Sequence, residues 1–182
     1  VENKQQACLV RFKKKLPRNL KRETILWNRK LGTGQYIIRN NQGTTLSCRG
    51  IITTWPNGII ENNEFTNVGY SGIAIGRSNF GERWFMGPGA SNLVIRGNRL
   101  KNVNRVKRGE ADIDMLSKGH KGILFRDILI ENNIIEGSVS NSQIYLSNIE
   151  NLTVRNNFYI DDNGNKSLIE AQISECTNSS LK

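Results

Sequence analysis

The sequence repeats one short phrase five times, and this repetition limits the possible folds more than any other feature. Each copy has an aliphatic residue, a charged residue and then Asn-Asn or Gly-Asn: 38–41, 60–63, 95–98, 130–133 and 154–157. The steps between the last Asn residues of successive copies are 22, 35, 35 and 24 residues, so a unit of 22–24 residues is lengthened twice by 11–13. Such a period indicates a solenoid, because each unit buries its apolar face only by stacking on the next.

The composition of the phrase indicates β-structure. Helical repeats need about 34–47 residues and long apolar stripes at helical spacing, which are missing here. Leucine-rich repeats have a similar period, but this framework consists of Ile, Val and Asn. β-Branched residues followed by Asn suit short strands joined by tight corners. The sequence therefore predicts an all-β fold, a right-handed parallel β-helix of the pectate-lyase type.

The Asn that ends each phrase has a physical role in such a fold. Asn tolerates left-handed backbone angles, and its amide group both donates and accepts hydrogen bonds. Stacked coils lie about 4.8 Å apart, so aligned Asn side chains can bond along the axis. We therefore expect one ladder and, one strand away, one shared apolar row: Asn63, Asn98, Asn133 and Asn157 for the ladder, and Ile60, Ile95, Ile130 and Val154 for the row.

Positive charge is concentrated at the start of the chain. Residues 1–30 contain ten Lys and Arg and two Glu, a net +8, out of +10 for all 182 residues. We expect this segment to be a basic lead-in, the end of an upstream module or of an inserted β-barrel, followed by β-helix coils and a C-terminal tail in residues 31–182. It lacks a nucleic-acid-binding motif, so a solvated strand and loop is expected rather than a nucleic-acid partner.

Other sequence features narrow the class of protein. The three cysteines have no metal-ligand spacing, so no metal or other cofactor is expected. No apolar run reaches the length of a membrane span, and no secretion signal is visible. The chain begins with Val1, and its first recognisable coil starts near Tyr36. We therefore expect it to be the C-terminal part of a longer protein whose earlier coils are missing.

Each repeat has a second predicted strand some 10–15 residues after its last Asn, at 50–52, 72–75, 111–115, 143–146 and 168–171. Side chains alternate between the two faces of a strand. If Ile113 and Met115 point inward, then Asp112 and Asp114 point outward. Three further side chains would lie beside them on the same sheet: Gln143, Tyr145 and Glu170.

The Asp pair suggests acid–base chemistry. Asp is disfavoured inside strands, and two residues at i and i+2 have Cα atoms about 6.5–7 Å apart on one face. Inverting glycosidases hold two carboxyls about 6.5–9.5 Å apart, which leaves room for a water. Unequal burial would raise one pKa and make that group the acid. The alternative is a solvated pair on an exposed strand, or carboxylates bonded to Arg105 or Arg108.

The two lengthened repeats add loops that can wall a groove. The insertions span about residues 76–90 and 103–121, and the second contains the acidic strand. Long loops on adjacent coils of a rigid scaffold often carry function. We expect residues 76–90 and about 103–110 to leave the stack on the same side, with Trp84 as a platform for a sugar ring and Arg77 bonding hydroxyls. The alternative is that Trp84 only pins its loop to the helix.

The order of these segments resembles a known class of enzymes. The strand Arg49–Thr54, the phrase Gly58–Phe65, the strand Gly72–Ile75, the aromatic loop ending Trp84–Pro88 and the phrase Asn92–Asn98 follow one another. This succession resembles right-handed parallel β-helix carbohydrate-active enzymes, and most of all glycoside hydrolase family 110, the inverting exo-acting α-1,3-galactosidases. The resemblance covers about residues 39–158 and implies catalytic carboxylates on outward positions. It also implies an extracellular or periplasmic location.

Three functions remain open on the sequence alone. The first is a glycoside hydrolase, in which Asp112 and Asp114 form the acid and base pair and side chains around them hold the sugar: Arg49, Arg77, Trp84, Gln143, Tyr145 and Glu170. The second is a polysaccharide lyase, with Asp112, Asp114 and Glu170 around Ca²⁺ and Arg49 or Lys118 as the base. The third is a non-catalytic glycan-binding or adhesin module. The fold does not decide among them.

Overall fold

The computed structural model is all-β. It describes residues 11–18, 20, 34–76, 89–107, 111–116 and 122–182, and these residues contain strands and no helix. Among them there is accordingly no helical segment with the length and apolar character that a membrane crossing requires. The expected absence of a long helix in the repeat region therefore holds for every described residue.

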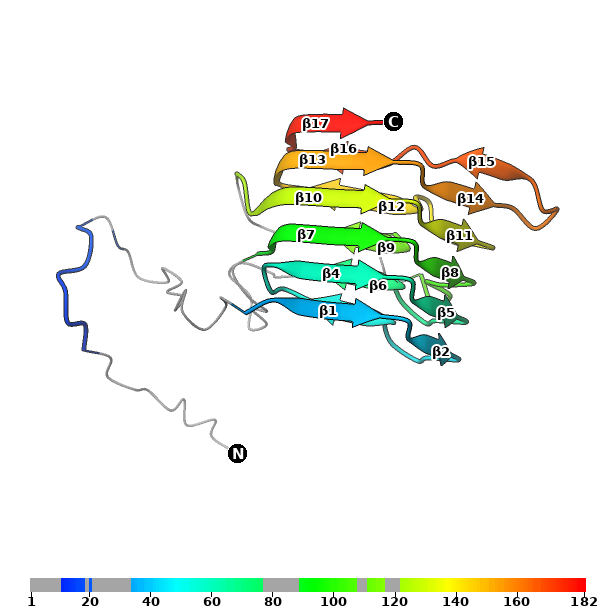
Figure 1. Ribbon diagram of the computed structural model, residues 1–182, viewed down its shortest axis with the longest axis horizontal. Helices are drawn as coiled ribbons and strands as arrows, with labels where there is room; N and C mark the ends of the chain where they lie inside the picture. The colour runs from blue at the N-terminus through cyan, green and yellow to red at the C-terminus, as the bar shows by residue number, and fades with distance from the viewer. Residues whose placement is uncertain (1–10, 19, 21–33, 77–88, 108–110, 117–121) are drawn as a thin grey trace.

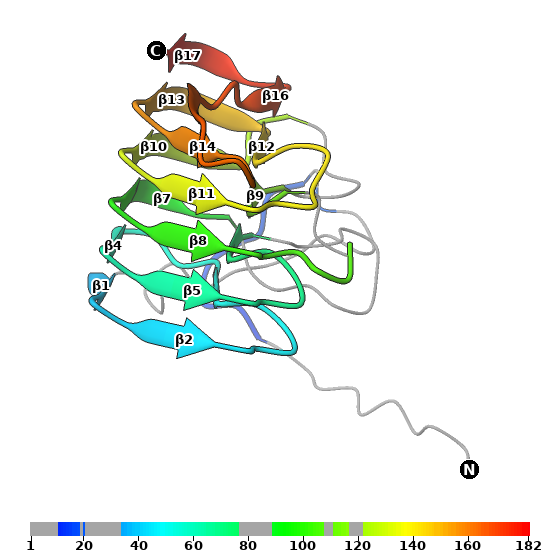
Figure 2. The same ribbon diagram turned by 90° about the vertical axis from the view of Figure 1, so that its right-hand side faces the viewer.

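Seventeen described strands form three sheets (Figures 1 and 2). The first sheet contains β1 (Tyr36–Arg39), β4 (Gly58–Glu61), β7 (Ser91–Arg96), β10 (Phe125–Glu131), β13 (Ile149–Arg155) and β17 (Thr177–Leu181). The second contains β2 (Gln42–Thr44), β5 (Glu64–Thr66), β8 (Arg99–Lys101), β11 (Ile134–Glu136), β14 (Phe158–Ile160) and β15 (Lys166–Leu168). The third contains β3 (Ile51–Thr53), β6 (Ile73–Ile75), β9 (Ile113–Met115), β12 (Ile144–Ser147) and β16 (Gln172–Ser174).

The chain passes through the first, second and third sheets in turn and then repeats the circuit. We call one such circuit a coil. Neighbouring strands in a sheet belong to successive coils and run parallel, and the one antiparallel pair among the described strands is β14 with β15. Figure 2 shows the coils stacked from β1 and β2 at one end to β17 at the other. The all-β prediction is confirmed, and the parallel sheets are consistent with the predicted β-helix.

The apolar residue of each phrase lies in one inward row of the first sheet. Ile60 aligns with Ile95, Ile95 with Ile130, and Ile130 with Val154, and their exposed fractions are 0–3%. Burying an Ile side chain contributes about 1.5–3 kcal/mol, so this row is a substantial part of the core. The predicted row is therefore confirmed.

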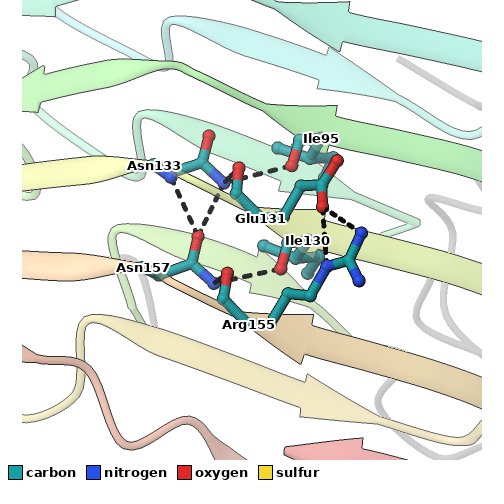
Figure 3. Close-up of polar contacts among 6 residues, drawn as sticks. All are labelled: Ile95, Ile130, Glu131, Asn133, Arg155 and Asn157. Atoms are coloured by element: carbon teal, nitrogen blue, oxygen red, sulfur yellow. Dashed lines mark hydrogen bonds and ion pairs between the residues drawn. The ribbon is translucent and has the colours of Figure 1, made fainter. Parts of the chain in front are cut away.

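The Asn residues that end the phrases form the predicted ladder. Each Asn donates from Nδ2 to Oδ1 of the Asn in the next coil, at 2.9 Å in all four steps from Asn41 to Asn157. The backbone N–H of the same residue donates to the same Oδ1 at 3.0–3.1 Å. Each Asn from Asn63 onward also donates to the carbonyl of the apolar residue in the preceding coil, as Asn133 does to Ile95 and Asn157 to Ile130 (Figure 3).

The residue before each ladder Asn makes the corner. Asn40, Asn62, Gly97, Asn132 and Asn156 all have φ between 53° and 62°. This is the left-handed region, which Gly and Asn occupy at low cost. From the sequence we expect one Asn to make the corner and to bond along the stack, whereas in the structure two residues divide these tasks. The first Asn or Gly turns the chain, and the second bonds along the stack, which explains why the two occur together.

We predict that Asn133→Ala lowers the free energy of unfolding by about 2–4 kcal/mol, because it leaves buried donors and acceptors on both neighbouring coils unpaired. Asn132→Gly is the matched control. It changes an exposed residue whose left-handed backbone suits Gly, so the expected loss is less than about 1 kcal/mol. Urea denaturation of the three proteins provides the comparison, and equal losses in both variants would contradict the role of the ladder.

Candidate functional site

The predicted acidic strand lies in the middle of the third sheet. Strand β9 pairs with β6 on one side and β12 on the other, so Asp114 aligns with Ala74 and with Tyr145. Ile113 and Met115 are fully buried and are aligned with the buried Ile73 and Ile75. Asp114 therefore projects from the opposite face of the sheet, in the same row as Tyr145, as expected.

Both carboxyls are buried, so the alternative of a solvated pair on an exposed strand does not hold. The exposed fraction is 0% for both Asp112 and Asp114, although Ile52, in the same outward row, is 41% exposed. Alternation along a strand gives the direction of a side chain, but not what covers that face. These carboxyls do not line an open surface in this structure.

Hydroxyl groups from neighbouring coils bond the two carboxyls. Ser71 Oγ donates to Oδ2 of Asp114, and Ser140 Oγ donates to Oδ1 of Asp112 at 2.6 Å. Asn104 in turn donates from Nδ2 to Ser140 Oγ at 2.8 Å. Oδ2 of Asp112 is buried and accepts no hydrogen bond from the described residues. The five residues form a polar cluster where three coils meet, which we call the carboxyl cluster.

Burial changes the acidity of one member of this cluster. The pKa of Asp112 is raised from 3.8 to about 7, chiefly because burial disfavours the charged form. Hydrogen bonds from Ser138 and Ser140 act in the opposite direction, and the nearby charge of Asp114 raises the pKa further. Asp112 thus keeps its proton up to about pH 7, far above the range of an ordinary Asp, as suits a general acid.

The serine and asparagine partners of the Asp pair were not predicted from the sequence. Ser71 and Asp114 are 43 residues apart, and Ser140 and Asp112 are 28 apart, so no local pattern joins them. One signal was present. Asn104 and Ser140 are 36 residues apart, close to the coil step of 35, and this near-match places them side by side in successive coils.

Of the other predicted site residues, some lie beside the carboxyl cluster and others do not. Tyr145 is half-buried beside Asp114. The backbone carbonyl of Gln143 accepts hydrogen bonds from the backbone N–H groups of Asp112 and Ile113, at 3.2 and 3.0 Å. Arg49 lies over the ring of Tyr70, 5.1 Å from its centroid. Arg77 and Trp84 lie outside the described residues, as does most of the two insertions, so the prediction that both loops leave the stack on one side stays a prediction.

The predicted place of Glu170 is wrong. Strand β16 begins at Gln172, and Gln172 is the residue that aligns with Tyr145. Glu170 is exposed in the connection between β15 and β16. The chain first forms β15, which pairs with β14 in an antiparallel hairpin, and only then joins the third sheet. The hairpin shifts the strand beyond the position that the repeat spacing predicted.

The described residues hold no group of three or more His, Cys, Asp or Glu side chains with the arrangement of a metal site. Asp112, Asp114 and Glu170 are all described, so they do not form the calcium-binding trio that a lyase of the expected type requires. A pocket of about 420 Å³ lies elsewhere, lined by Leu46, Asn67, Arg105 and their neighbours. It offers polar and apolar contacts but no pair of carboxyls.

Comparisons with protein-family models, with curated proteins and with solved structures found no match to this chain. The resemblance to glycoside hydrolase family 110 therefore stays a prediction.

We predict a pH signature for the buried carboxyl of Asp112. Between pH 4 and 7 the unfolded chain loses this proton while the folded chain keeps it, so the folded state is progressively disfavoured as pH rises and the penalty is constant above pH 7. Asp112→Asn keeps the acceptor for Ser140 and has no such penalty. The free energy of unfolding of Asp112→Asn, relative to that of the parent, should rise by up to roughly 4 kcal/mol between pH 3.5 and 8.

The measurement is urea denaturation across this pH range, with Asp162→Asn as the control because Asp162 is exposed. The control should show no comparable rise relative to the parent. A stability difference between Asp112→Asn and the parent that does not change with pH would show that Asp112 ionises with its ordinary acidity.

Proposed function

We propose that this chain is a right-handed parallel β-helix that hydrolyses a glycan with the Asp112–Asp114 pair, in the manner of an inverting exo-α-galactosidase. The observation that carries the proposal is the carboxyl cluster itself. Asp114 lies on β9, the central strand of the third sheet, beside Tyr145, Asp112 immediately precedes this strand, and hydroxyl groups from other coils bond both carboxyls. By the same resemblance we propose an extracellular or periplasmic location.

The two carboxyls are suited to different roles. Asp112 keeps its proton near neutral pH, so it is the proposed acid, which gives its proton to the glycosidic oxygen as the bond to the sugar breaks. Asp114 is the proposed base, which takes a proton from the water that attacks the anomeric carbon from the opposite face. Ser140 and Ser71 hold the reacting carboxyls in place, and Tyr145 lies beside Asp114.

The burial of both carboxyls places a condition on this proposal. A sugar reaches them only if the side chains that cover the cluster move aside when substrate binds. Burial also favours the second candidate, a non-catalytic glycan-binding or adhesin module in which the Asp residues serve as structural hydrogen-bond acceptors. The lyase alternative has no such support, since the three carboxylates it needs are not assembled.

We predict that Asp112→Asn and Asp114→Asn each lower turnover about 10²–10⁴-fold, because general acid and base groups typically contribute that much. Hydrolysis is measured on α-1,3-linked galactosides and on a panel of other α- and β-glycosides, with proton NMR to read the configuration of the first product. Asp162→Asn, on an exposed side chain, should keep full turnover.

Four outcomes would overturn or redirect the proposal. Turnover that survives in both Asp variants would remove the cluster from the chemistry. Glycan binding without hydrolysis by the parent protein would support the adhesin module. Turnover that EDTA abolishes, with an unsaturated product, would support the lyase. Retention of configuration would refute the inverting mechanism while leaving a hydrolase in place.

A further inference from the structure

A row of alternating charges runs along the outer face of the first sheet. The charged residues of the five phrases align from coil to coil in the order Arg39, Glu61, Arg96, Glu131 and Arg155. Arg96 bonds Glu61, and Arg155 bonds Glu131, each with an N–O distance of 2.7 Å. Neighbouring coils thus carry opposite charges at this position. We call this set the charge row.

The Asn ladder has a direction. Every ladder Asn from Asn63 to Asn157 receives at Oδ1 the N–H groups of the preceding Asn, and gives one Nδ2 hydrogen to the carbonyl of the preceding coil. Asn41, in the first described coil, donates to Asn63 and to the carbonyl of Arg39, two residues before it, as later ladder Asn residues also do within their own coils. Among the described residues it has no carbonyl of a preceding coil to donate to. No described residue donates to Oδ1 of Asn41. This acceptor faces the position of a preceding coil.

The apolar row is incomplete at the same end. Ile38 is half-buried, whereas Ile60, its partner in the next coil, is fully buried. Strands β1, β2 and β3 are the edge strands of their sheets in the described structure. All three pair in parallel on their other side, so their free edges are templates for further parallel strands. Figures 1 and 2 show β1 and β2 at one end of the stack.

The opposite end of the stack differs in two ways. In the second sheet β15 runs antiparallel to β14, so the parallel pattern stops there, and Figure 1 shows this hairpin projecting from the stack. In the charge row, Lys182 follows Arg155, since its carbonyl accepts the N–H of Asn156. A second copy stacked head to tail would place Lys182 against Arg39. The two like charges and the antiparallel strand disfavour this arrangement.

We propose that the face formed by β1, β2 and β3 binds one further parallel coil, from a polypeptide segment outside residues 34–182, that carries Asn at the ladder position and Glu or Asp in the charge row. The acid pairs with Arg39. The new Asn donates to Oδ1 of Asn41, and its coil provides the carbonyl that Asn41 lacks. Apolar side chains of the same coil complete the burial of Ile38.

The test builds this coil into the chain. A copy of residues 36–57 is inserted before Tyr36, with Leu in place of the copied Tyr, because Tyr36 lies over a glycine, Gly58, in the next coil. The copy of Arg39 is either kept as Arg or changed to Glu. Each insertion is combined with native Arg39 or with Arg39→Glu. The four proteins form a charge-swap cycle with identical ladder and apolar residues.

The expected result is a higher Tm for the two proteins with opposite charges than for the two with like charges, by about 2–4 °C, the shift expected for a partly exposed ion pair in a chain of this size. Both proteins with opposite charges should also have a higher Tm than the parent. Equal Tm values across the cycle, or insertions that melt below the parent in every combination, would overturn the proposal.

A second measurement tests the ladder separately from the charges. Asn41→Ala should lower Tm at least twice as much in the insertion protein with Glu opposite native Arg39 as in the parent. In that insertion protein Asn41 bonds coils on both sides. An equal loss in both backgrounds would show that the inserted coil does not join the ladder. A parent that forms dimers in native mass spectrometry, with Arg39→Glu changing the dimer fraction, would instead identify the occupant as a second copy and refute the proposed partner.

Discussion

The hydrogen bond between successive Asn side chains is the interaction on which the rest of this structure depends. Each bond joins an amide of one coil to the next at 2.9 Å, and the four Asn residues from Asn63 onward are almost completely buried. If the pairing of two successive coils shifted by one residue, a turn residue would be buried in place of the ladder Asn and the apolar row would face outward. The ladder therefore fixes the register of all three sheets, including the alignment of Asp114 with Tyr145.

The same constraint explains how the chain accepts long insertions. Two coil steps are 35 residues rather than 22–24, yet Asn98 still bonds both Asn63 and Asn133. The extra residues of the first long step fall between β6 and β7, and those of the second fall on both sides of β9. In the phrase that follows each insertion, the left-handed Asn or Gly and the ladder Asn restore the register. Extra length in a loop costs little closure entropy, so coils can vary in length without disturbing their neighbours.

The spacing of the repeats predicted the scaffold. It did not predict the contacts between coils that form the site. The ladder, the inward Ile row and the β9 alternation followed from spacing alone. The burial of Asp112 and Asp114 did not, because it depends on what covers the outer face and on hydroxyl groups from other coils. Glu170 was misplaced because the β14–β15 hairpin breaks the repeat, a local pairing that competes with the period.

Side-chain hydrogen exchange tests the central claim most directly. In a ¹⁵N-labelled protein, the Nδ2 protons of Asn63, Asn98, Asn133 and Asn157 should exchange with deuterium as slowly as the backbone amides of the core strands, because each amide is buried and hydrogen-bonded. The side-chain amides of Asn132 and Asn156, which lie exposed at the corners, should exchange rapidly. Rapid exchange of all six would contradict the account.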